Sequence, residues 1–149
     1  MRYNIALVPA QPTSYKLYTQ SAQRNFANRY SQYLLGKDSL PHITLCQFDD
    51  TSEFDEKKGI GEEMLQKIIK KLETKFIDHV YHPMFIGINF LKLAGQFGEL
   101  FASDMFSVEL LVQREAKLVG LHEDIASMVI ALGFQPLNTL GAAYRPHLT

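Results

Sequence analysis

One four-residue pattern occurs twice in the 149-residue chain, as Pro-His-Ile-Thr at 41–44 and as Pro-His-Leu-Thr at 146–149. The ordinary pKa of imidazole is near ~6.5, so one histidine can accept a proton while another donates one around neutral pH. Threonine hydroxyls can donate hydrogen bonds to phosphate oxygens without the help of a metal ion. The candidate acid–base residues are therefore His42 and His147, and the candidate phosphate ligands are Thr44 and Thr149.

Each pattern is expected at the start of a β-strand. Proline biases the residue before it toward extended backbone and is tolerated at the first position of a strand. Residues two apart in a strand share a face, so His42 and Thr44 point together while Ile43 points to the opposite side. The same spacing sets His147 and Thr149 on one face of a second strand. Two such pairs, brought together, would hold a phosphate from both sides.

The structural alternative is that these are ordinary strand residues, because a single His-x-Thr on a strand is common. Two copies, each preceded by proline at a predicted strand start, favour the functional interpretation. A second alternative is a binding module that keeps the groove and lacks catalysis.

Other polar residues have a functional and a structural interpretation. His79 and His82 could bind a metal, but no second ligand cluster at zinc-site spacing accompanies them, so we expect a surface loop and neither metal nor cofactor. His122 is expected at the solvated edge of a helix, and Cys46 as a small buried apolar residue. A further set is expected on a solvated helix face, with contact to an RNA backbone as the alternative: Lys67, Lys70, Lys71 and Lys75.

The apolar spacing predicts the order strand, helix, strand, helix, two strands, helix and strand. Helices are expected at 15–35, 60–77 and 115–132, with Gly36 and Gly133 as C-terminal stops. Strands are expected at 2–8, 41–45, 84–93, 100–112 and at the second motif. Local hairpins combined with packed helices predict an α+β fold with mostly antiparallel sheets. No linker-like stretch divides the chain, so we expect a single domain over residues 1–149.

Composition is ordinary for a soluble globular protein, with 46% hydrophobic and 21% charged residues. The net charge of −1, from 15 basic and 16 acidic residues, favours a small ligand or an RNA end over extended duplex binding. A single cysteine excludes an intrachain disulfide. The short apolar stretch near the N-terminus is below the length of a signal-peptide core or a membrane span, so a cytoplasmic location is expected.

The two motifs resemble the signature of the 2H phosphoesterase superfamily, which includes the 2′-5′ RNA ligase-like proteins and cyclic phosphodiesterases. That signature is His-x-Ser/Thr followed by an apolar residue, present twice. The first copy is complete, with Leu45 in the fourth position, and Phe48 follows where members often carry an aromatic residue. Tyr144 lies three residues before the second histidine, where similar proteins also often have an aromatic residue. The resemblance extends over essentially the whole chain.

The resemblance implies a bilobal α+β fold in which two mostly antiparallel sheets line a central cleft and helices cover the outside. It implies a metal-independent phosphodiesterase, an RNA-processing hydrolase acting on 2′,3′-cyclic phosphates or 2′-5′ linkages of nucleotides or RNA ends. The partner would be such a nucleotide or RNA terminus, with no membrane and no obligate protein partner. His42 and His147 would be the acid–base pair, Thr44 and Thr149 the phosphate ligands, and Tyr144 would stack on a base or pack in the core.

One departure from the family pattern concerns the second motif. The chain ends at Thr149, without the apolar fourth residue and the remainder of the strand. Truncation of the chain at its C-terminus would explain this departure.

Overall fold

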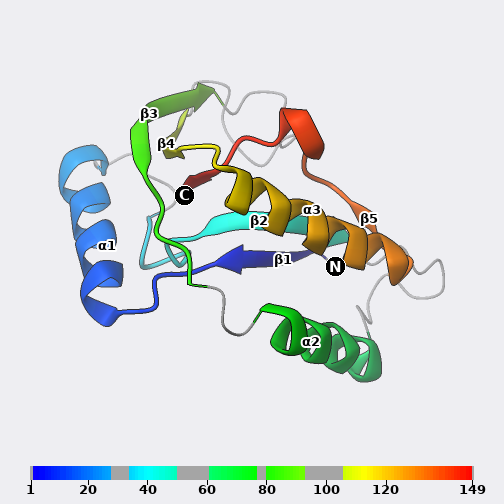
Figure 1. Cartoon of the computed structure of the whole chain (residues 1–149). Coiled ribbons are helices and arrows are strands. Elements are labelled where there is room, and N and C mark those ends of the chain that lie inside the picture. The colour runs from blue at the N-terminus through cyan, green and yellow to red at the C-terminus, as the bar shows by residue number, and fades with distance from the viewer. Residues whose placement is uncertain (1, 28–33, 50–60, 77–79, 93–105, 149) are drawn as a thin grey trace. The chain divides into compact units, whose positions relative to one another are not determined.

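The computed structural model describes residues 2–27, 34–49, 61–76, 80–92 and 106–148. Within these residues the protein is α+β, with three α-helices and a six-stranded antiparallel sheet (Figure 1). The strand order is β1-β2-β6-β4-β3, and β5 pairs with β2. None of the described helices has the length and apolar character needed to span a lipid bilayer.

The chain divides into two compact units, and the backbone passes between them several times. The first unit comprises Met1–Ile5, Leu45–Pro83 and Glu115–Tyr144, and the second comprises Ala6–Thr44, Met84–Arg114 and Arg145–Thr149. Both histidine motifs fall in the second unit. The expectation of a single domain stays a prediction.

In the second unit, the strands that carry the two motifs are neighbours. The first two residues of β2 (Ile43–Asp49) belong to this unit. β2 pairs antiparallel with β6 (His147–Leu148), with Ile43 opposite Leu148. β4 (Phe106–Val112) pairs with β6 so that Leu111 lies opposite His147. β3 (Phe85–Lys92) is antiparallel to β4, and the strand order of this unit is β2-β6-β4-β3.

Helix α1 (Pro12–Phe26) completes the second unit beside β3 (Figure 1). It begins with Pro12 in its first turn, where the fixed φ of proline suits a helix and its missing N–H costs no hydrogen bond. Two edge-on aromatic contacts attach it to β3, from Tyr18 to Phe85 with ring centroids 5.7 Å apart and from Phe26 to Phe90 at 6.2 Å.

In the first unit, the core is built around α3 (Ala116–Ala131). One face of this helix is buried, with the side chains of Leu118, Leu121, His122, Ile125, Ala126, Met128 and Val129. The opposite face is exposed. Gly133 follows the helix with a positive φ of 89°, which confirms the predicted C-terminal stop. Helix α2 (Glu62–Phe76) buries Ile68 and is joined to α3 by an ion pair between Lys75 and Asp124 at 3.2 Å.

An aromatic cluster holds the strand residues of the first unit. Phe48 of β2 stacks on Tyr3 of β1 (Arg2–Leu7), with ring centroids 5.6 Å apart, and contacts Phe134 at 5.2 Å. Beside this cluster, β5 (Gln135–Pro136) pairs antiparallel with β2, with Pro136 opposite Phe48. A short 3₁₀ helix, Gly141–Ala143, leads to Tyr144.

Most predicted elements are confirmed to within a few residues, but the helix expected over 15–35 is wrong at its C-terminal end. Helix α1 starts at Pro12 and ends at Phe26, and residues 28–33 lie outside the described part. Further on, Leu34 belongs to a turn, because its N–H donates to Asp38 Oδ2 at 2.7 Å and its carbonyl accepts from the Asp38 N–H at 2.8 Å. Gly36, with φ of 86°, serves this turn and does not stop the helix. The two-residue strand β5 was not predicted, and positions 93 and 100–105 of the expected strands are outside the description.

Candidate functional site

The first motif has the alternating burial that its sequence predicts. Pro41 and Ile43 are buried, with Ile43 only 3% exposed, whereas His42 and Thr44 are half-buried. Ile43 therefore points into the protein core, and His42 and Thr44 share the opposite face.

The second motif repeats this arrangement on the adjacent strand. Pro146 and Leu148 are buried, and the side chain of His147 is 29% exposed. Because Ile43 lies opposite Leu148 in an antiparallel ladder, the next pair along the register is Thr44 with His147. Directly opposite residues have Cβ atoms about 4.5–5.5 Å apart, and diagonal neighbours such as His42 and His147 are about 7–8 Å apart. The pairing thus brings both histidines and Thr44 together on one face of the second unit.

Each histidine ring is held by the backbone of its own motif. Nδ1 of His42 lies 2.7 Å from the carbonyl of Leu40, and Nδ1 of His147 lies 3.0 Å from the carbonyl of Arg145. A carbonyl oxygen can only accept, so Nδ1 donates its proton in both cases. The neutral form of each ring therefore carries its proton on Nδ1, and Nε2 is the nitrogen that remains available for chemistry.

Glu109 of β4 is part of this site, and the sequence did not single it out. Its side chain is 5% exposed, and its Oε1 lies 3.5 Å from Nε2 of His147. Its Oε2 accepts a hydrogen bond from Nδ2 of Asn89 at 3.0 Å and lies 3.7 Å from Nη2 of Arg145. A buried carboxylate requires such partners, because desolvation disfavours an unpaired charge. The available signal was a single acidic residue inside the apolar run 108–112.

The two histidines differ in the contacts that their Nε2 atoms make. Both ring nitrogens of His147 lie near oxygen atoms, Nδ1 near the carbonyl of Arg145 and Nε2 near the carboxylate of Glu109. No described residue makes a hydrogen bond to Nε2 of His42, which leaves that nitrogen free to accept a proton.

Two of the candidate site residues are not placed with the others. Thr149 lies outside the described residues. Tyr144 is 5% exposed and its ring stacks on His122, with centroids 3.7 Å apart and planes 4° from parallel. Of the two roles expected for Tyr144, base stacking and core packing, the structure shows core packing. A nucleotide base cannot occupy the ring face that His122 covers. Burial also raises the pKa of the Tyr144 hydroxyl, so it stays protonated.

The prediction that His122 lies at a solvated helix edge is wrong. Its side chain is fully buried, and Nδ1 lies 2.6 Å from the carbonyl of Leu45. The buried face of α3 is wider than the predicted stripe, because it also includes His122, Ala126 and Val129, whereas the opposite face is exposed. His122 is thus a packing residue of the first unit.

The remaining candidates show no site of their own. Cys46 is fully buried, as predicted, and burial raises the pKa of its thiol to about 11. His82 is exposed, and His79 lies outside the described residues. In the part of the chain that the structure describes, no three His, Cys, Asp or Glu side chains are grouped to share a metal ion.

Comparisons with known proteins give no match to a protein-family model, to a curated protein or to a solved structure. Any functional assignment therefore depends on the two motifs and on the geometry around them.

Proposed function

We propose that this protein is a metal-independent phosphodiesterase that acts on 2′,3′-cyclic phosphates or 2′-5′ linkages of nucleotides or RNA ends. The observation that carries the proposal is the antiparallel pairing of β2 with β6, which places His42, Thr44 and His147 on one face. The resemblance of the two motifs to those of 2H phosphoesterases supports the reaction class. The bilobal arrangement around a cleft and the cytoplasmic location belong to the same proposal.

The contacts of the two rings support separate roles for them. His42 acts as the general base, because its Nε2 has no hydrogen-bond partner among the described residues. His147 acts as the general acid, because Glu109 offers a negative charge to its protonated ring at 3.5 Å. Thr44 donates its hydroxyl to a nonbridging phosphate oxygen, and Thr149 does the same from the second motif.

In hydrolysis of a cyclic phosphate, Nε2 of His42 accepts a proton from water as the water oxygen bonds to phosphorus. One phosphorus–oxygen bond of the ring breaks, and His147 gives its proton to the departing ribose oxygen. The products are a phosphomonoester and a free ribose hydroxyl. Proton exchange with solvent then returns both histidines to their starting forms.

The experiment is a hydrolysis assay with 2′,3′-cyclic nucleotides and 2′-5′-linked dinucleotides in excess EDTA. Wild-type protein is expected to turn over at least one of these substrates. His42→Ala and His147→Ala should each lower kcat by about 10²–10⁴-fold, the range for general acid–base catalysis. Thr44→Val should lower kcat by about 10²-fold, as for loss of one oxyanion donor, while Thr44→Ser retains most activity.

His82→Ala is the matched control, because it removes an exposed imidazole outside both motifs. Equal turnover by His42→Ala, His82→Ala and wild type would rule out the assignment. Nucleotide binding by calorimetry without product from any substrate would instead identify a binding module.

A further inference from the structure

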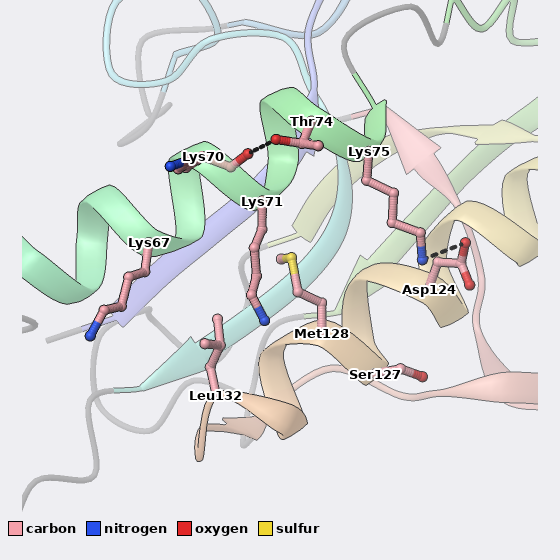
Figure 2. A pocket seen from close by; sticks show the side chains of 9 residues that line it. All are labelled: Lys67, Lys70, Lys71, Thr74, Lys75, Asp124, Ser127, Met128 and Leu132. Carbon is pink, nitrogen blue, oxygen red and sulfur yellow. Dashed lines mark hydrogen bonds and ion pairs between the residues drawn. The ribbon is translucent and has the colours of Figure 1, made fainter.

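A basic groove lies between α2 and α3 in the first unit. It has a volume of about 650 Å³, within the usual range of ligand sites. Figure 2 shows Lys67, Lys71 and Lys75 projecting from α2 on the side that faces α3. These lysines are four residues apart, so they form a single row along the helix. At a rise of 1.5 Å per residue, the row extends over about 12 Å.

The three lysines differ in how they are paired. Lys67 contacts Glu63 of its own helix at 2.7 Å, and Lys75 contacts Asp124 at 3.2 Å. More than half of each lysine side chain is exposed, and exposed pairs of this kind exchange readily for another anion. Lys71 has no carboxylate within ion-pairing distance among the described residues. The row therefore presents one ammonium without a carboxylate partner among the described residues, between two weakly paired ones.

The wall opposite the lysines combines apolar side chains with the acidic Asp124 and the polar Ser127. Met128 and Leu132 line it, and Figure 2 shows the Lys71 side chain extending toward them. Ser127 adds a hydroxyl on the same helix. A ligand that fits this groove would carry several negative charges on the side that faces the lysines. On the side that faces Met128 and Leu132 it would be mostly apolar.

We propose that this groove binds the backbone of a single-stranded nucleic acid. Successive phosphates lie along the row Lys67, Lys71 and Lys75, and sugars and base edges pack on Met128 and Leu132. The net charge of the whole chain is −1, so the attraction is local to this groove. The proposal goes beyond the phosphodiesterase proposal and does not depend on the chemistry of His42 and His147.

The test measures fluorescence anisotropy of a labelled 12-nucleotide oligouridylate with a free 3′ hydroxyl, over a series of NaCl concentrations. For a single strand, each phosphate contact contributes about 0.7 to the slope of log K against log salt concentration. Lys71→Gln should therefore reduce the slope by about 0.7, and the double variant Lys67→Gln/Lys71→Gln by about 1.4. Glutamine keeps the helix propensity of lysine, so the fold is retained. Performing the titration also in a His42→Ala background separates this binding from events at the motifs.

Lys16→Gln is the matched control, because it removes the same charge from an exposed position of α1 in the second unit. It should leave both affinity and slope unchanged. An unchanged slope in the Lys67→Gln/Lys71→Gln variant would overturn the proposal. Binding to phosphatidylserine vesicles without binding to the oligonucleotide, or equal competition by polyglutamate, would overturn it as well.

Discussion

Nε2 of His147 lies 3.5 Å from Oε1 of Glu109, a carboxylate whose side chain is only 5% exposed. This contact crosses from β6 to β4, and it gives one of the two motif histidines a fixed negative neighbour. The proposed acid–base roles rest on this asymmetry, since Nε2 of His42 has no such neighbour among the described residues.

Replacing Glu109 with Gln tests whether this charge matters for activity. The amide oxygen of Gln can still accept the hydrogen bond from Asn89, so the second unit should remain folded. Loss of the negative charge removes the ionic partner of His147, and we expect kcat to fall by about 10-fold or more with little change in KM, as part of the acid–base contribution. Steady-state kinetics with the best cyclic substrate measure the effect. Thermal denaturation of Glu109→Gln serves as the folding control, and wild-type kcat in this variant would contradict the positioning role.

The buried thiol of Cys46 predicts a loss of stability at high pH. Burial raises its pKa to about 11 from an ordinary value of 9.0, so the unfolded chain releases this proton at a lower pH than the folded one. The contribution is complete below pH 9 and is lost as pH rises through 11, because ionisation then favours the unfolded state. Urea denaturation at pH 8 and at pH 10.5 should show a smaller free energy of unfolding at the higher pH.

Cys46→Ala is the control for this pH dependence. The variant is less stable at pH 8 because it leaves a small cavity, but its free energy of unfolding should fall less between the two pH values. An identical fall in wild type and variant would mean that other groups cause it. The same burial predicts slow alkylation of native protein by iodoacetamide at pH 8, and rapid alkylation in urea.

His122 is expected to stabilise the first unit through its single buried hydrogen bond. His122→Phe keeps an aromatic ring to stack on Tyr144 but leaves the carbonyl of Leu45 without its donor. We expect the free energy of unfolding to fall by about 1 kcal/mol, because the loss of the hydrogen bond to Leu45 is partly offset by the removal of Nε2, a buried nitrogen with no hydrogen-bond partner among the described residues. Chemical denaturation measures this loss. His82→Phe, at an exposed position, should be nearly neutral, and similar losses in both variants would show that the Leu45 contact is not the cause.

The local part of the site could be predicted from sequence, because it depends on geometry within four residues. The shared face of His42 and Thr44 follows from the period-2 alternation of a strand, and the burial of Ile43 and Leu148 agrees with it. The pairing of β2 with β6 depends on register between distant segments, which no local pattern specifies. Glu109 was missed for this reason, since its role arises only once β4 lies beside β6.

The errors in the fold have similar causes. The apolar stripe of the first predicted helix continues to Leu34, but reciprocal hydrogen bonds between Leu34 and Asp38 hold that segment in a turn. His122 borders the predicted apolar stripe of α3 and precedes the charged Glu123, whereas in the structure the buried face of the helix extends to include His122. In both cases tertiary contacts override a local preference.

The carbonyls that orient the two imidazoles belong to Leu40 and Arg145, two positions ahead of each ring. A main-chain oxygen remains when a side chain is replaced, so a change in the side chain of Leu40 or Arg145 does not itself remove either hydrogen-bond acceptor. What sets each anchor is the path of the chain through the intervening proline, Pro41 or Pro146. Replacing either proline with a residue of less constrained backbone would therefore make the orientation of the following histidine ring less fixed. No candidate site side chain would be altered.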